Sequence, residues 1–108
     1  MSNVVCLINS RQDLEAIYSG SRELPEFDFD KYTLIIGQQI MPCRDFYLVK
    51  KELLADVNGL VLNLYVRNDG DNLSTAIQHL YYWGVYPKLV QKSILVKDFK
   101  DYPNHPDL

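Results

Sequence analysis

Short apolar runs at two places in the chain are typical of buried β-strands. The first is Val4-Val5-Cys6-Leu7-Ile8, and the second is Tyr32-Thr33-Leu34-Ile35-Ile36. Both are rich in β-branched residues and are short enough to be strands rather than buried helices. The second run is apolar at successive positions, which predicts a central strand covered on both of its faces.

One helical period lies between these two runs. Ser10 is a favourable N-cap, and Asp13 follows it at the spacing of a capping interaction. The apolar positions that share one helical face are Leu14, Ile17 and Tyr18. Gly20 is a typical left-handed cap, so the predicted helix spans about Arg11 to Ser19. A helix this short is not stable alone and must dock on the sheet.

The middle and end of the chain show the rhythm of hairpins. Residues 46–55 and 60–67 flank a segment that ends in Asn58-Gly59, a strong signal for a tight β-hairpin. Apolar and polar residues alternate with period two in the second of these strands, so one face is drier than the other. Residues 68–72 are turn formers, and residues 92–97 predict a last strand.

The segment before that last strand is ambiguous. Apolar residues recur at helical spacing over 73–84, but 81–86 is dense in aromatic and β-branched strand formers. We assign a strand to 76–86 and keep the helix over 73–84 as the alternative. A strand sends Tyr81, Trp83 and Val85 to one face and Leu80, Tyr82 and Tyr86 to the other.

These elements together predict the fold class. We expect an α+β fold in which one N-terminal helix packs on a largely antiparallel sheet of five or six strands in a meander. The length of 108 residues fits a single domain, which we place at 1–100. Residues 101–108 contain two prolines and predict an irregular C-terminal tail.

Composition narrows the classes of function. The chain is 47% hydrophobic and 23% charged, which is typical of a globular domain rather than a disordered one. It has no apolar run near the ~20 residues of a membrane span. The net charge is −3 with no dense basic cluster, which argues against a nucleic-acid partner. The first residues lack the features of a signal peptide, so a cytoplasmic protein and an exported protein without its leader both stay open.

No catalytic or metal-binding motif is present, so we predict no cofactor, no metal and no enzyme activity. Cys43 and His79 are the only conceivable nucleophile and base, and they leave a cysteine-dependent enzyme as the minor alternative. Cys6 and Cys43 could form a disulfide, although two unlinked thiols are the simpler interpretation. Four clustered carboxylates lack the spacing of a calcium loop. They are Glu23, Glu26, Asp28 and Asp30.

The aromatic segment around Trp83 is the feature that best suggests a function. One short helix cannot cover both faces of a sheet, so part of this strand should lie near solvent. Tyrosine and tryptophan are favoured at binding surfaces because they combine a large contact area with a polar tip. We therefore predict a partner-binding site at Tyr81, Tyr82 and Trp83. The alternative is that these rings are simply core.

Two short motifs also resemble a group of known domains. They are the loop Leu24-Pro25-Glu26-Phe27-Asp28-Phe29-Asp30-Lys31 before the strand at 32–36, and Tyr86-Pro87-Lys88-Leu89. The pattern over residues 7–97 resembles small exported lipoprotein domains of Bacteroides-type bacteria and is similar to the C-terminal domain of the PrcB protease-complex subunit. Where that domain opens its third strand with Gly-Tyr, this chain has Asp45-Phe46-Tyr47.

The resemblance implies export to the cell envelope or periplasm, with a lipid anchor on a removed leader as an open alternative. It implies binding or assembly more than catalysis, and it carries over no site residue. The favoured function is an exported protein-interaction module with an unknown protein partner. A small-ligand-binding domain and an enzyme of unrecognised type stay open, as does the oligomeric state.

Overall fold

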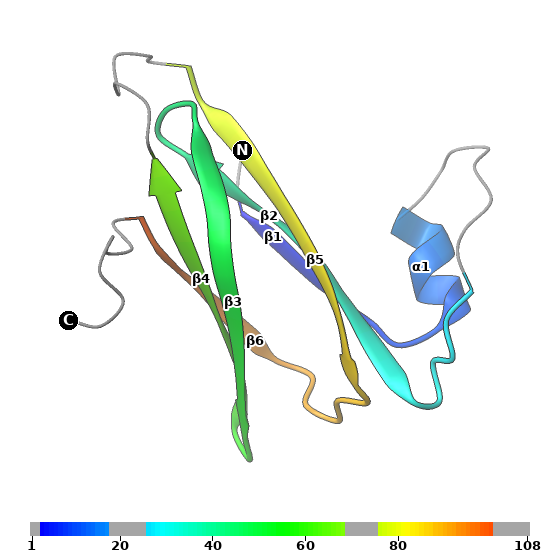
Figure 1. Ribbon diagram of the computed structural model, residues 1–108. Helices are drawn as coiled ribbons and strands as arrows, with labels where there is room; N and C mark the ends of the chain where they lie inside the picture. Colours follow the sequence, from blue (N-terminus) through cyan, green and yellow to red (C-terminus); the bar gives the residue numbers. More distant parts are fainter. Residues whose placement is uncertain (1–2, 18–25, 69–75, 101–108) are drawn as a thin grey trace.

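The computed structural model describes residues 3–17, 26–68 and 76–100 of the chain (Figure 1). The fold is mostly β, with one short helix and six strands in these residues. In chain order the elements are β1 (Val4–Ile8), α1 (Arg11–Ile17), β2 (Tyr32–Met41), β3 (Phe46–Asp56), β4 (Gly59–Asn68), β5 (Gln78–Pro87) and β6 (Ile94–Phe99).

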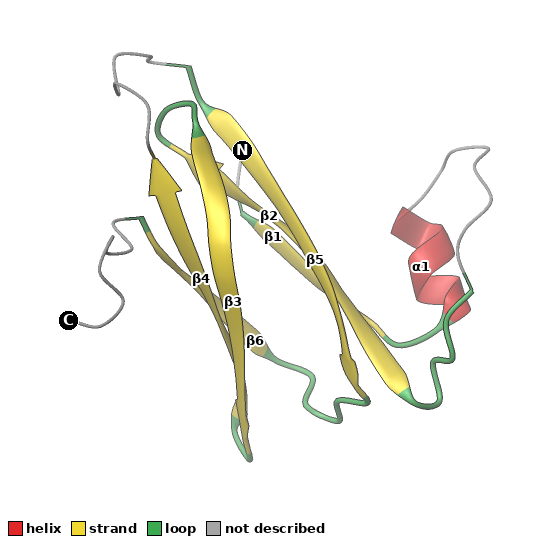
Figure 2. Ribbon diagram, in the orientation of Figure 1, coloured by secondary structure: helices red, strands yellow, loops and turns green. Residues whose placement is uncertain are grey.

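The strands form two three-stranded sheets rather than one. The first sheet has the order β1-β2-β5 and is antiparallel throughout. The second has the order β3-β4-β6, in which β3 and β4 are antiparallel while β4 and β6 are parallel. Figure 2 shows the two sheets as separate layers, with α1 on the far side of the first sheet.

The mixed α+β composition is confirmed, but the prediction of a single five- or six-stranded meander is wrong. The chain leaves the first sheet after β2, returns to it with β5 and leaves it again for β6. Alternation of apolar and polar residues indicates which side chains share a face. It does not indicate which strand lies next to which, so the changes of sheet had no local signal.

Two apolar clusters hold the layers together. The cluster between the two sheets is built on Ile35, Leu62, Leu64 and Tyr82. The cluster beneath the helix joins Ile8, Leu14 and Leu34. β2 contributes Ile35 to the first cluster and Leu34 to the second, so the predicted central strand is covered on both faces at these residues. Farther along β2, the side chains on the helix side are only half-buried.

The start of the helix is also confirmed. The Asp13 backbone N–H donates to Ser10 Oγ over 3.1 Å, which satisfies one of the free donors of the first turn. Leu14 is buried on the first sheet and is the residue through which α1 docks. The predicted end at Ser19 and the predicted cap at Gly20 lie outside the described residues.

The β3–β4 hairpin forms where Asn58-Gly59 predicts it. Asp56 pairs with Gly59, leaving a two-residue loop. One Asp56 carboxylate oxygen accepts hydrogen bonds from the Asn58 N–H (2.7 Å) and the Gly59 N–H (3.1 Å). Gly59 has φ of 151°, a conformation that side chains other than hydrogen disfavour.

β5 confirms the strand assigned to the aromatic segment, although it begins at Gln78. β6 lies two residues later than the predicted last strand. The predicted turn at 69–72 and the predicted tail at 101–108 lie outside the described residues.

Side chains connect the two sheets where no backbone ladder does. The Gln78 amide makes two bonds to the Phe46 backbone, accepting from its N–H (2.9 Å) and donating to its carbonyl (2.8 Å). Near the other side of the sandwich, Gln39 Nε2 donates to Asp98 Oδ2 over 2.7 Å. These bonds link β5 to β3 and β2 to β6, so each sheet fixes the position of the other.

Candidate functional site

The candidate site is the side of the first sheet that faces away from the second sheet. The strand register brings residues of β1, β2 and β5 into rows across it: Val4, Gln38 and Tyr81 form one row, and Cys6, Ile36 and Trp83 form the next. α1 covers the first part of the row formed by Ile8, Leu34 and Val85, where Leu14 packs on Leu34, and leaves Val85 39% exposed. We call the part beyond the helix the outer face. Its members are Val4, Cys6, Ile36, Gln38, Ile40, His79, Tyr81, Trp83 and Val85.

Two of the three residues predicted to bind a partner are exposed on this face. Tyr81 is 72% exposed and Trp83 is 63% exposed. Tyr82 is only 3% exposed and packs in the cluster between the sheets. The structure therefore places Tyr81 and Trp83 on the same side of the strand and Tyr82 on the opposite side, buried between the two sheets.

The outer face carries no formal charge. Along β1, β2 and β5, which the structure describes completely, the positions on this side include no Asp, Glu, Lys or Arg. His79 is the one side chain that β5 places there that can take up a positive charge. An exposed aromatic surface without charges matches the centre of a protein interface, where charged residues are depleted and aromatic ones enriched.

The exposed side of the second sheet has a different character. Its charged members are Lys50, Glu52, Asp56, Arg67 and Lys97. Asn63 Nδ2 (3.2 Å) and the Tyr65 hydroxyl (3.1 Å) donate to one Glu52 oxygen and hold the Glu52 pKa below its ordinary value. The Tyr65 ring stacks on Phe99 and carries the Lys50 ammonium 5.5 Å from its centroid. The Tyr65 ring is thus engaged within the chain, while Phe99 and Tyr47 are still 43% and 40% exposed.

Tyr82 shapes the interior beneath the outer face. Its ring lies over Gly37, where an added Cβ would come within 2.3 Å of the Tyr82 hydroxyl oxygen and 2.7 Å of the Val4 carbonyl oxygen. The hydroxyl is buried and has no hydrogen-bond partner among the described residues. Burial, which disfavours the charged form, raises the pKa of Tyr82 to about 12.

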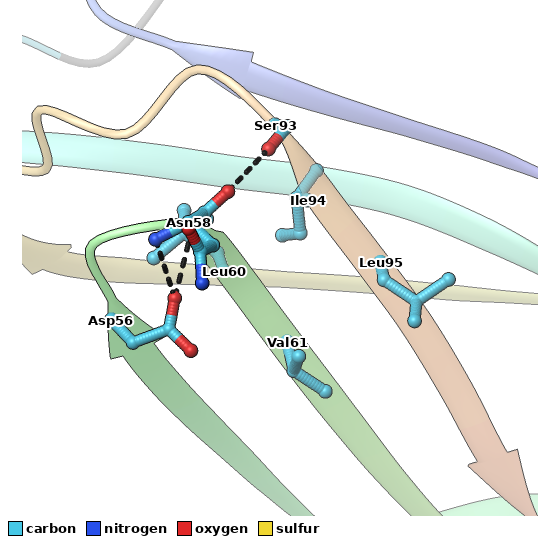
Figure 3. Close-up of a pocket in the computed structure, with 8 residues that line it drawn as sticks. Asp56, Asn58, Leu60, Val61, Ser93, Ile94 and Leu95 are labelled. Carbon is cyan, nitrogen blue, oxygen red and sulfur yellow. Dashed lines mark hydrogen bonds between the residues drawn. The ribbon is translucent and has the colours of Figure 1, made fainter.

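A pocket of about 290 Å³ lies at the β3–β4 hairpin and the start of β6 (Figure 3). Two of its polar side chains already have partners: Asp56 accepts from the hairpin backbone, and Ser93 Oγ donates to the Asn58 carbonyl over 3.4 Å. A ligand site needs a few polar groups that converge on the space. Here they stabilise the turn, so the pocket does not favour small-ligand binding.

The remaining candidates from the sequence are dispersed. Cys6 lies in β1 and Cys43 between β2 and β3, and no disulfide joins them. Asn68 Nδ2 lies 3.5 Å from Cys43 Sγ, to which it donates, while His79 lies on β5 opposite Ile40.

The acidic cluster is only partly described, because Glu23 lies outside the described residues. Asp28 has a local role: its Oδ1 accepts from the Asp30 N–H and its carbonyl from the Lys31 and Tyr32 N–H groups. In the described part of the chain no group of three or more His, Cys, Asp or Glu could hold a metal ion.

Sequence reasoning missed the neighbours that make the outer face continuous, chiefly Val4, Cys6 and Ile36. Their apolar character was visible, but their position beside Trp83 depends on the pairing of β1 and β5 with β2. It also missed that the second sheet, rather than the helix, covers Tyr82.

Fold and site together define a two-sheet β domain with one docked helix and an uncharged aromatic face. Comparisons with models of protein families, with curated proteins and with solved structures find no match. Within the described residues, no helix has the length and apolar character needed to cross a membrane.

Proposed function

We propose that this chain is a protein-interaction domain that binds its partner through the outer face. The observation that carries the proposal is the joint exposure of Tyr81 and Trp83 on a surface without charges. Scattered apolar residues on a surface are ordinary, but a contiguous aromatic patch usually marks a binding site. Tryptophan and tyrosine are also among the residues that contribute most to interface energy.

The geometry favours binding by side chains. Tyr81 and Trp83 stand on a strand paired with β2 along its whole length, so little backbone freedom is lost when a partner orders them. Lys51 on β3 donates a hydrogen bond from its Nζ to the Trp83 carbonyl. This carbonyl, at the edge of β5, already has a hydrogen-bond donor within the chain. A partner therefore meets the flat side of the strand rather than adding a strand at Trp83. The proposal assigns no reaction to Cys43 and His79.

Export to the envelope or periplasm is part of the proposal and rests only on the resemblance carried by the motifs at 24–31 and 86–89. A cytoplasmic domain with the same binding face is the alternative. Fractionation of the source cells, with detection of the untagged native protein, separates the two. Recovery in the cytoplasmic fraction alone contradicts export and leaves the binding face unaffected.

Site-specific photocrosslinking tests the binding face directly. A benzoylphenylalanine is placed at Tyr81 and, as a matched control, at Leu95, which is 56% exposed on the other sheet. We expect a discrete crosslinked protein species from position 81 in source cells and none from position 95. Equal crosslinking from both positions, or none from position 81, contradicts the proposal.

A further inference from the structure

We propose that the partner on the outer face is a second copy of this chain, so that two copies pack outer face against outer face. The inference rests on the proposed function and names its partner. Such a dimer has a two-fold axis, and every residue on the face meets a residue of the same face.

The first argument is charge. In a two-fold interface residue i of one copy meets residue j of the other, and only residues near the axis meet their own counterparts. A face with formal charges must therefore desolvate them, and like charges near the axis repel each other. The outer face avoids this because its strand positions hold no Asp, Glu, Lys or Arg. The exposed side of the second sheet has three basic side chains, Lys50, Arg67 and Lys97, and the two carboxylates of Glu52 and Asp56. Of the two sheet surfaces, only the outer face can pack on its own copy without desolvating a formal charge on its strands.

The second argument is area. Tyr81 and Trp83 expose about 150 Å² each, taking ~200–250 Å² for a whole aromatic side chain. Val4 and Val85, which are 46% and 39% exposed, bring the apolar area to roughly 400 Å². A standard interface buries about 800 Å² per partner, of which ~57% is apolar. The outer face thus supplies about the apolar area that one side of a stable dimer needs.

The third argument is shape. α1 stands on the first sheet near Leu34, at the end where β2 begins, while Tyr81 lies toward the other end (Figure 1). Helices and facing sheets both take up about 10 Å between layers. If the strands of the two copies run in opposite directions, the α1 of each copy lies past the end of the other copy's Tyr81 and Trp83 rows. There it fills the space between the two facing first sheets. A parallel arrangement would make the two helices collide.

The oligomeric state of the purified chain tests the inference. Sedimentation equilibrium over about 1–200 µM should show a dimer for the wild type. Trp83→Ser should weaken the dimer by about 30-fold or more, as expected for an interface residue of this kind. Leu95→Ser, which removes a similarly exposed side chain from the other sheet, should leave the dimer intact. Circular dichroism of each variant verifies that it is folded.

The native cysteines give a second readout without substitution. Cys6 lies on the outer face beside Ile36, whereas Cys43 lies in the segment after β2. Alkylation of Cys6 should slow as protein concentration rises, while alkylation of Cys43 should not change. If the Trp83→Ser variant loses this protection of Cys6 from alkylation, the contact between the two copies lies on the outer face.

The failures of the two proposals are distinguishable. A wild type that is monomeric throughout the range, but crosslinks another protein from position 81, overturns the second-copy inference and leaves the proposed function standing. If Leu95→Ser dissociates the dimer and Trp83→Ser leaves it intact, the inference is also overturned, because the copies then meet through the second sheet.

Discussion

Replacing Tyr82 by phenylalanine should make the protein more stable. The Tyr82 hydroxyl is buried in the cluster between the sheets and has no hydrogen-bond partner among the described residues. A hydroxyl moved from water to such a place costs about 1–3 kcal/mol. Tyr82→Phe removes the cost and keeps the ring over Gly37. We expect the free energy of unfolding to rise by about 1–2 kcal/mol, equivalent to roughly 4–8 °C in Tm.

The same substitution should change the response to alkaline pH. The pKa of Tyr82 is about 12 in the folded chain and about 10 in an unfolded one. The stability linked to this group is fully present below pH ~10 and is lost as pH rises toward ~12, by at most about 1.4 kcal/mol per pH unit. Tyr82→Phe lacks this loss, so its advantage should grow above pH ~10. Burial also raises the pKa of Tyr86, so the variant keeps part of the alkaline decline.

Urea unfolding followed by circular dichroism, at neutral pH and above pH ~10, measures both effects. Tyr81→Phe is the matched control, because its hydroxyl lies on a 72% exposed side chain and its removal should change stability by less than about 0.5 kcal/mol. If Tyr82→Phe lowers stability while Tyr81→Phe does not, the hydroxyl has a partner and the argument is refuted.

Two further substitutions test the packing between the sheets. Gly37→Ala should destabilise the fold by at least about 2 kcal/mol, because the added Cβ overlaps the Tyr82 ring and the Val4 carbonyl; thermal unfolding that matches the wild type would show that strand β5 moves freely there. Gln78→Ala should cost about 1–3 kcal/mol through the loss of two bonds to the Phe46 backbone. Hydrogen exchange of the Phe46 amide should accelerate in this variant, and an unchanged rate would mean that the amide is protected by other contacts.

Local features of the fold were predictable from the sequence because their causes are local. Ser10 caps the helix through a bond within one turn, and the loop at Asn58 needs only a glycine in the right conformation after it. Alternation along β5 correctly separated Tyr81 and Trp83 from Tyr82, since neighbouring side chains of a strand point to opposite sides.

The arrangement of strands was not predictable, because its causes lie far apart in the chain. β6 runs parallel to β4 although β5 lies between them in sequence and belongs to the other sheet. The short contact between Gly37 and Tyr82 likewise exists only once β5 has paired with β2. The residues of the outer face were visible singly, but the surface follows from the pairing.

The parallel pairing of β4 with β6 has a consequence for the order of folding. The β3–β4 hairpin closes a two-residue loop, and hairpins of this kind form within microseconds. β6 and β4 are separated in sequence by β5, which belongs to the opposite sheet, so their pairing closes a much longer loop than the hairpin and costs more chain entropy. Until β6 has paired, Leu62 and Leu64 lack the cover of Ile94 and Val96. Folding should therefore be slow and cooperative, with an early hairpin that exposes apolar surface and is sensitive to aggregation.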